Sequence, residues 1–221
     1  MNIIEPSFKI LEPLEFTREA LLHSHLEVIE DAARTCYKSE GKAVPGKAGE
    51  FVRKIGRVFK HESVLEHSSV TVKFITDRGV SHELVRHRLA AYSQESTRYC
   101  NYGKGNEITV INPPFFESED QAERVRYAIW YDAMLKAEEA YLTLLENGAS
   151  PQEARSVLPN SLKTEIVMTT NFREWRHVLK LRTSPQAHPQ MRQLMIPLLN
   201  LFKEVLPEIF DDINEDDTRN S

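Results

Sequence analysis

Residues 70–91 read VTVKFITDRGVSHELVRHRLAA, and the pattern changes within this stretch. Val70, Val72 and Phe74 alternate with polar residues, which predicts a strand with one buried face. From Gly79 to Ala91 the apolar residues follow helical spacing, so we expect a helix there. A strand that is followed at once by a helix indicates a fold that mixes both kinds of element.

The sequence on either side of this stretch extends the same prediction. On the N-terminal side we expect helices at Thr17–Tyr37 and Gly49–His61, separated by a mobile, glycine-rich loop. On the C-terminal side we expect, in order, a strand at Ile108–Ile111, a long helix from a Ser118 cap to Asn147 with its stop at Gly148, a helix opened by Ser150-Pro151-Gln152-Glu153, a strand at Leu162–Thr170, and helices at Arg173–Leu181 and Pro189–Phe202. Long helices with few, non-repeating strands predict an α+β fold, with a mostly antiparallel sheet flanked by helices. We expect one domain over residues 1–221, with an acidic, frayed tail at 211–221.

Composition excludes several classes of protein. The chain has 221 residues, a net charge of −5, 41% hydrophobic residues and 28% charged residues, which argues against disorder. A pI near 5.9 argues against general nucleic-acid affinity. No apolar run approaches the length of a membrane span, and the N-terminus lacks a signal-peptide pattern, so no membrane association is expected. Two cysteines without metal or redox spacing favour a cytoplasmic protein.

Polar residues are densest at 86–99. Arg86-His87-Arg88 and Arg98 supply fixed cations, and Ser93, Ser96 and Thr97 add neutral donors. The rigid guanidinium fork suits phosphate, so this composition favours a site for a nucleotide or a dinucleotide. The simpler alternative is a solvated basic helix end that is stabilised by the helix dipole.

The spacing within this stretch resembles the signature of the flavin-dependent thymidylate synthases, which is Arg-His-Arg, seven residues, then Ser. Here it runs from Arg86 to Ser96. Further segments resemble the same family in the same order along most of the chain: His61-Glu62-Ser63-Val64-Leu65-Glu66-His67, Ala154-Arg155-Ser156-Val157-Leu158-Pro159, Asn171-Phe172-Arg173, His177, Leu181-Arg182, and His188-Pro189-Gln190.

The resemblance implies a reaction and a set of partners. The reaction is conversion of dUMP to dTMP, in which methylenetetrahydrofolate supplies the carbon and FAD, reduced by NADPH, supplies the hydride. The resemblance implies a homotetramer with FAD between subunits. It implies FAD contacts from Ser63, Arg86, His87, Arg88, Gln94, Asn171, Arg173 and His177. It implies dUMP contacts from Glu83, Leu84, Val85, Arg86, Gln94, Glu95, Ser96, Thr97, Arg98, Arg155 and Arg182. Arg182 is implied as the catalytic residue, because a permanent cation beside uracil N3 favours the anion that activates carbon 5.

The chain departs from the family at two positions. Some members carry Gln where this chain has Glu83, and Glu where it has Gln94. A carboxylate cannot donate a hydrogen bond to a phosphate or carbonyl oxygen, whereas a glutamine keeps an acceptor and adds a donor. Glu83 is therefore a weaker candidate for a substrate contact than Gln94.

Alternative interpretations rest on weaker patterns. The two histidines of the 61–67 segment are six residues apart and do not share a helix face, so no metal site is expected. Cys36 and Cys100 lack the signature of a nucleophile, and packing is the ordinary role of a lone cysteine. One rival function is an RNA-binding or nucleotide-sensing module that stacks bases on Tyr92, Tyr99 and Tyr102. A second rival is a nucleotide hydrolase, which would usually need a metal site.

Overall fold

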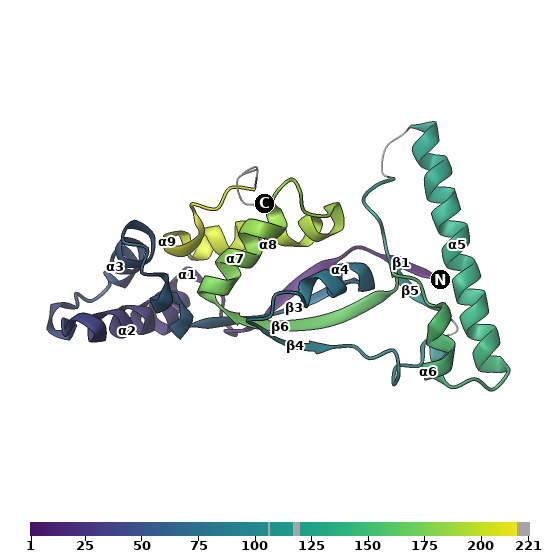
Figure 1. Ribbon diagram of the computed structural model, residues 1–221, viewed down its shortest axis with the longest axis horizontal. Helices are drawn as coiled ribbons and strands as arrows, with labels where there is room; N and C mark the ends of the chain where they lie inside the picture. The colour runs from purple at the N-terminus through teal and green to yellow at the C-terminus, as the bar shows by residue number, and fades with distance from the viewer. Residues whose placement is uncertain (106, 117–119, 216–221) are drawn as a thin grey trace. The chain divides into compact units, whose positions relative to one another are not determined.

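The protein is described by a computed structural model over residues 1–105, 107–116 and 120–215 (Figure 1). The chain forms two compact units. Unit 1 consists of Met1–Ser7, Phe74–Arg86 and Tyr92–Val167, and unit 2 consists of Phe8–Lys73, His87–Ala91 and Met168–Ser221. The expectation of a single domain over residues 1–221 stays a prediction.

The strands form two sheets. The larger is antiparallel, with the order β2 (Ser7–Glu12), β3 (Ser69–Asp77), β6 (Lys163–Asn171) and β4 (Ala91–Gln94). The smaller pairs β1 (Asn2–Ile4) in parallel with β5 (Thr109–Ile111), with Asn2 opposite Thr109. The strands predicted from residues 70–74, 108–111 and 162–170 are all present. Together with the long helices they confirm the α+β class.

The core of unit 1 lies between the small sheet and the helix α5 (Gln121–Glu146). Val110 on β5 packs with Met134 and Tyr141 on α5, and all three side chains are buried. The Asp120 side chain accepts a hydrogen bond from the Ala122 N–H at 3.3 Å, so it caps the helix. The predicted cap, Ser118, lies outside the described residues. After α5, the predicted capping box of Ser150 and Glu153 opens the short helix α6 (Pro151–Ala154).

One predicted helix in unit 1 is shorter than expected. The pattern from Gly79 to Ala91 predicted a helix throughout, but α4 (Arg78–Leu84) ends at Leu84 and β4 begins at Ala91. The Tyr92 hydroxyl donates to the Leu84 carbonyl oxygen at 2.8 Å. A side chain thereby satisfies a carbonyl at the helix end, where no further turn is available to do so. The residues between α4 and β4 carry the Arg-His-Arg motif.

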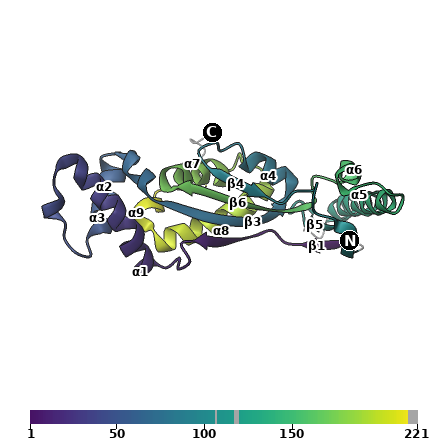
Figure 2. The same ribbon diagram turned by 90° about the horizontal axis from the view of Figure 1, so that it is seen from below.

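In unit 2 the N-terminal helices contain π-helical turns. The predicted helix at 17–37 is present as α1 (Arg18–Leu21), a π-helical turn (Leu22–Leu26) and α2 (Glu27–Tyr37). The helix predicted to reach His61 is α3 (Ala48–Arg53) with a π-helical turn to Val58, so it ends earlier than expected. Figure 2 shows α2 and α3 side by side, and residues of each pack together. The 61–67 segment forms a 3₁₀ turn (Glu62–His67) immediately before β3.

The C-terminal helices complete unit 2. They are α7 (Phe172–Thr183), α8 (Pro189–Val205) and α9 (Pro207–Phe210), and α7 packs beside α8 (Figure 1). Trp175, Phe202 and Phe210 are fully buried and form an aromatic core with edge-to-face and tilted contacts. At the start of the tail, Asp212 pairs with Arg176, whereas residues 216–221 lie outside the described part. Among the helices of residues 1–105, 107–116 and 120–215, none combines the length and the hydropathy that a membrane crossing requires.

Candidate functional site

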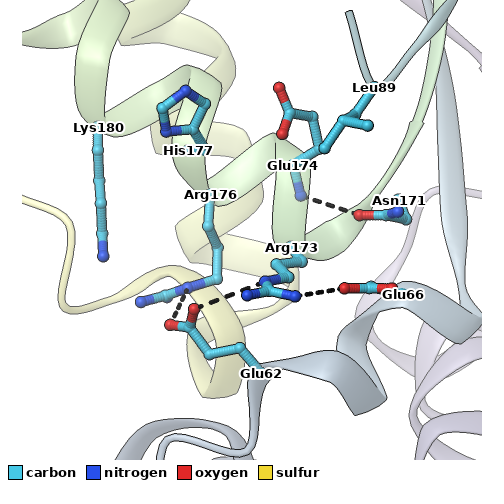
Figure 3. Close-up of a pocket in the computed structure, with 9 residues that line it drawn as sticks. All are labelled: Glu62, Glu66, Leu89, Asn171, Arg173, Glu174, Arg176, His177 and Lys180. Atoms are coloured by element: carbon cyan, nitrogen blue, oxygen red, sulfur yellow. Dashed lines mark hydrogen bonds and ion pairs between the residues drawn. The ribbon is translucent and has the colours of Figure 1, made fainter. Parts of the chain in front are cut away.

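A cavity of about 800 Å³ opens in unit 2 where β6 passes into α7 (Figure 3). Polar and charged side chains from two segments line it, and a third segment adds one leucine. The lining residues are Glu62, Glu66, Leu89, Asn171, Arg173, Glu174, Arg176, His177 and Lys180. Three of the FAD contacts predicted from the sequence, Asn171, Arg173 and His177, therefore lie in one cavity.

The local sequence explains why these side chains gather on α7. Asn171 caps the helix, because its Oδ1 accepts a hydrogen bond from the Glu174 N–H at 2.9 Å. From this fixed start, Arg173, His177 and Lys180 recur at four- and three-residue intervals and lie on one face of the helix. Figure 3 shows these side chains extending from α7 into the cavity. The cavity therefore combines an amide, an imidazole and three cations with three carboxylates, and its cations are groups that can bind an anion.

Acidic residues hold two of the arginines in place. Arg173 forms an ion pair with Glu66 and lies 3.9 Å from a Glu62 carboxylate oxygen. Arg176 is buried and binds Asp212 through two hydrogen bonds, of 2.7 and 2.8 Å. A bidentate arginine is fixed in orientation as well as in charge. A ligand phosphate would therefore meet a guanidinium that is already ordered.

A second feature of unit 2 joins two residues of the predicted site. Arg182 Nε donates a hydrogen bond to His87 Nε2 at 2.9 Å. His87 is buried, and burial, the Arg182 charge and His177 lower its pKa from 6.5 to about 4. An arginine donor requires an unprotonated acceptor, so His87 is neutral and carries its proton on Nδ1. That nitrogen lies 3.6 Å from Glu174 Oε1.

Three of these side chains have the spacing of metal ligands. His87, Glu174 and His177 each offer a ligand atom, and these atoms lie within 4.8 Å of one another. The charge of Arg182 lies against the His87 ring, however, and its N–H occupies Nε2. A cation in contact with a ligand opposes the binding of a second cation. We therefore do not assign a metal site to the trio, of which Glu174 and His177 line the cavity.

Several other residues predicted from the sequence lie in unit 1. Gln94, at the end of β4, donates from Nε2 to Ser81 Oγ on α4 at 2.8 Å and to Thr164 Oγ1 on β6 at 3.2 Å. The amide is thus used as a donor by the protein itself. Both bonds use N–H groups, which a glutamine side chain has and a carboxylate lacks.

The residues that follow Gln94 form a tight turn. The Ser96 carbonyl oxygen accepts from the N–H groups of Tyr99 and Cys100, at 3.1 and 3.0 Å, and Ser96 Oγ accepts from the Arg98 N–H at 3.3 Å. Thr97 is buried, and its hydroxyl oxygen accepts from Arg155 Nη1 at 3.4 Å. The turn therefore brings Arg155, Thr97 and the backbone of Arg98 into one local group. In this group the guanidinium of Arg155 and the hydroxyl of Thr97 are donors of the kind that bind phosphate, whereas the Arg98 N–H donates to Ser96 Oγ.

The chain is similar to a family of known proteins over most of its length. The sequence profile of the family described as "Thymidylate synthase complementing protein" matches residues 20–208. A flavin-dependent thymidylate synthase of Corynebacterium aurimucosum is 36% identical over 203 residues, which are 85% of this chain and 79% of the relative. The chain belongs to the flavin-dependent thymidylate synthase family.

Other members and solved structures agree with this assignment. The flavin-dependent thymidylate synthase of Mycolicibacterium gilvum is 38% identical over 200 residues, covering 84% of this chain and 78% of the relative. Thymidylate synthase X of Helicobacter pylori, solved with FAD and dUMP, has a TM-score of 0.67 and 25% identity over 85% of this chain and 95% of that one. The UMP/dUMP methylase PolB of Streptomyces cacaoi, bound with 5-Br dUMP, shares the fold, with a TM-score of 0.75 and 22% identity over 96% of each chain.

The remaining residues that the family resemblance implied lie outside these contacts. Ser63, Arg86 and Arg88 are exposed, and they do not line the described cavity of unit 2. Glu83, Leu84 and Val85 form the last turn of α4 and the residue after it. The sequence prediction did not include Glu174, Arg176 and Lys180 as site residues. Arg176 and Lys180 follow Arg173 by three and seven residues, so helical spacing could have indicated them. Glu174 is the next residue after Arg173, and this spacing does not mark it.

Proposed function

We propose that the chain is a flavin-dependent thymidylate synthase, which converts dUMP to dTMP with methylenetetrahydrofolate as the carbon donor. In this proposal FAD is the cofactor and NADPH reduces it. The observation that carries the proposal is the hydrogen bond from Arg182 to His87. It joins the predicted catalytic residue to the Arg-His-Arg motif through a histidine that is neutral at physiological pH.

Arg182 has a defined chemical task in this proposal. Carbon 5 of uracil is a poor nucleophile until the N3 proton is removed and electron density moves through the ring. A guanidinium beside N3 and its neighbouring carbonyl stabilises that anion electrostatically. His87 binds the Nε hydrogen of Arg182 and so fixes the plane of the guanidinium. Because His87 is neutral, it does not repel this cation.

The residues of unit 2 suit an anionic cofactor. Arg173, His177 and Lys180 would hold the phosphates of FAD, and the Asn171 side chain keeps the start of α7 in place. When bound and reduced, the flavin supplies the hydride. In unit 1, Arg155 and the turn at residues 96–98 would hold the phosphate of dUMP.

We further propose a homotetramer with FAD between subunits, located in the cytoplasm. Val125 and Ile129 on α5 are 54% and 66% exposed one helical turn apart, and a neighbouring chain would cover such apolar side chains. Cys36 and Cys100 are both free thiols, in keeping with a reducing compartment. Light scattering of the purified protein tests the assembly.

An absorption spectrum followed by an activity assay tests the proposed function. The purified protein should be yellow, and heat should release FAD from it. The protein should then form dTMP from dUMP when methylenetetrahydrofolate and NADPH are present, and it should form none when either is omitted. A colourless protein that does not take up added FAD would contradict the proposal.

A further inference from the structure

A partly buried charge cluster lies beside the turn that the proposed function assigns to the dUMP phosphate. Glu95 Oε1 accepts a hydrogen bond from the Tyr102 hydroxyl at 2.8 Å, and Glu95 Oε2 accepts from Lys163 Nζ at 3.0 Å. Lys163 also donates to Glu165 Oε1 at 2.7 Å. The Glu95 and Lys163 side chains are only 15% and 20% exposed. Both carboxylate oxygens of Glu95 are thus bound within the protein.

The backbone ties the same residue to the sheet. The Glu95 N–H donates to the Glu165 carbonyl oxygen on β6 at 2.8 Å. The next residue, Ser96, begins the turn whose carbonyl oxygen accepts from Tyr99 and Cys100. Glu95 is therefore held at its backbone and at both side-chain oxygens immediately before the proposed phosphate site.

The charges of this cluster are not those of a phosphate ligand. A carboxylate repels a phosphate dianion and has no proton to donate to it. Burial alone would lower the pKa of Lys163, but its hydrogen bonds to Glu165 and Glu95 raise it, so the lysine stays charged. Burial and the bond to Glu95 raise the pKa of Tyr102 far above its usual range, so its hydroxyl remains a donor.

We propose that Lys163 and Tyr102 are positioning residues for substrate binding, and that they act through Glu95. Lys163 neutralises the carboxylate, and Tyr102 fixes its orientation. Together they hold the turn at residues 96–98 in the geometry that receives the phosphate of a pyrimidine nucleotide. The inference rests on the proposed function, and it assigns to Glu95 the role of an anchor in place of a direct phosphate contact.

The test uses the full-length, FAD-loaded enzyme and variants of both partners. Lys163→Met leaves Glu95 and Glu165 without their shared cation, and Tyr102→Phe removes one hydrogen bond at almost constant volume. Lys163→Arg restores a cation. Lys136→Met is the matched control, because Lys136 forms an exposed ion pair with Asp132 on α5. The measurements are the FAD content, the dissociation constant for dUMP, and kcat and KM for dTMP formation.

We expect Lys163→Met to raise the dissociation constant and the KM for dUMP at least tenfold, and Tyr102→Phe to raise them several-fold. FAD content and kcat at saturating dUMP should stay within threefold of the parent. A raised KM with an unchanged kcat is expected when the lost interaction stabilises the bound substrate and the transition state equally. The double variant should weaken binding by less than the product of the single effects, because both residues act through Glu95. Lys163→Arg should recover most of the affinity, and Lys136→Met should behave as the parent.

The inference is wrong if Lys163→Met and Tyr102→Phe both bind dUMP within twofold of the parent. It is equally wrong if they lose FAD together with dUMP, since that result indicates a structural role only. Tyr102→Phe decides the matter if Lys163→Met does not fold. A parent enzyme that binds dUMP but forms no dTMP would contradict the proposed function and leave the positioning test intact.

Discussion

Arg182 and His87 are 95 residues apart in the sequence, yet Arg182 Nε donates to His87 Nε2 at 2.9 Å. The bond needs an imidazole without a proton on Nε2, and burial together with the Arg182 charge keeps the His87 pKa near 4. The motif histidine is thereby neutral, and the arginine is fixed in orientation.

Arg182→Ala should slow catalysis without preventing cofactor binding. Loss of a preorganised catalytic charge typically costs about 10²–10³ in rate. In single-turnover experiments with pre-reduced enzyme and saturating dUMP, we expect flavin oxidation to slow by at least about a hundredfold. Arg192→Ala is the control, because Arg192 binds the Thr183 carbonyl oxygen at the end of α7. A rate for Arg182→Ala within a few-fold of the parent would remove this residue from catalysis.

Acid should destabilise the protein partly through His87. The unfolded state takes up this proton near pH 6.5, but the folded state does so only near pH 4, so the unfolded state binds more protons between these values. The free energy of unfolding therefore rises with pH across this window, by about 2–3 kcal/mol from this group. Urea unfolding at pH 4.5 and pH 7 should show a smaller acid loss for His87→Asn than for the parent. Equal losses would mean that the His87 pKa is not lowered.

Arg155→Ala should separate the two ligands. Arg155 donates to Thr97 within the turn of unit 1, and the proposed function places it on the dUMP phosphate. Hydrogen bonds to charged groups contribute about 1.5–3 kcal/mol, so the dissociation constant for dUMP should rise at least tenfold. FAD content should remain nearly normal. Calorimetry with dUMP and an absorption spectrum measure both, and parallel loss of the two ligands would instead indicate a structural arginine.

Variants of Arg86 and Arg88 test whether these two arginines, which do not line the described cavity, contact FAD. Both side chains are exposed, so their replacement should cost little stability. If they hold the cofactor, the double alanine variant should retain FAD at least several-fold less tightly. The measurement is the bound flavin after gel filtration, with the midpoint of thermal unfolding as the check on the fold. Full occupancy in the double variant would exclude both residues from the FAD site.

The sequence predicted those helices and strands whose residue pattern indicates one type of element and whose ends are marked in the sequence. The strand predicted at 162–170 from its β-branched residues is β6, and the helix predicted at 173–181 is α7, and the bounds of both agree within two residues. The predicted end of α4 was wrong because apolar residues continue at helical spacing past Leu84. In the structure the helix ends at Leu84, whose carbonyl oxygen accepts a hydrogen bond from the Tyr92 hydroxyl. The strands β1 and β4, with three and four residues, are too short for periodicity to identify.

The sequence could predict those parts of the candidate site whose residues lie close together in the chain. Arg173 and His177 share one face of one helix, and a helical repeat would also have indicated Lys180. The bond between Lys163 and Glu95 spans 68 residues, and no local pattern links them. The sequence could not show that Arg182 contacts His87 either, because only the fold brings the end of α7 to the Arg-His-Arg motif. The sequence therefore indicated candidate site residues, and the structure shows which of them are in contact.

The folate product tests the central claim most directly. If the flavin supplies the hydride, the folate gives up only its one-carbon unit, and each dTMP is accompanied by one tetrahydrofolate and the consumption of one NADPH. If the folate itself supplied the hydride, each dTMP would be accompanied by one dihydrofolate and no NADPH would be needed. We predict tetrahydrofolate and NADPH oxidation in equal amounts with dTMP under anaerobic conditions. Dihydrofolate in equal amount with dTMP, formed without NADPH, would contradict the account.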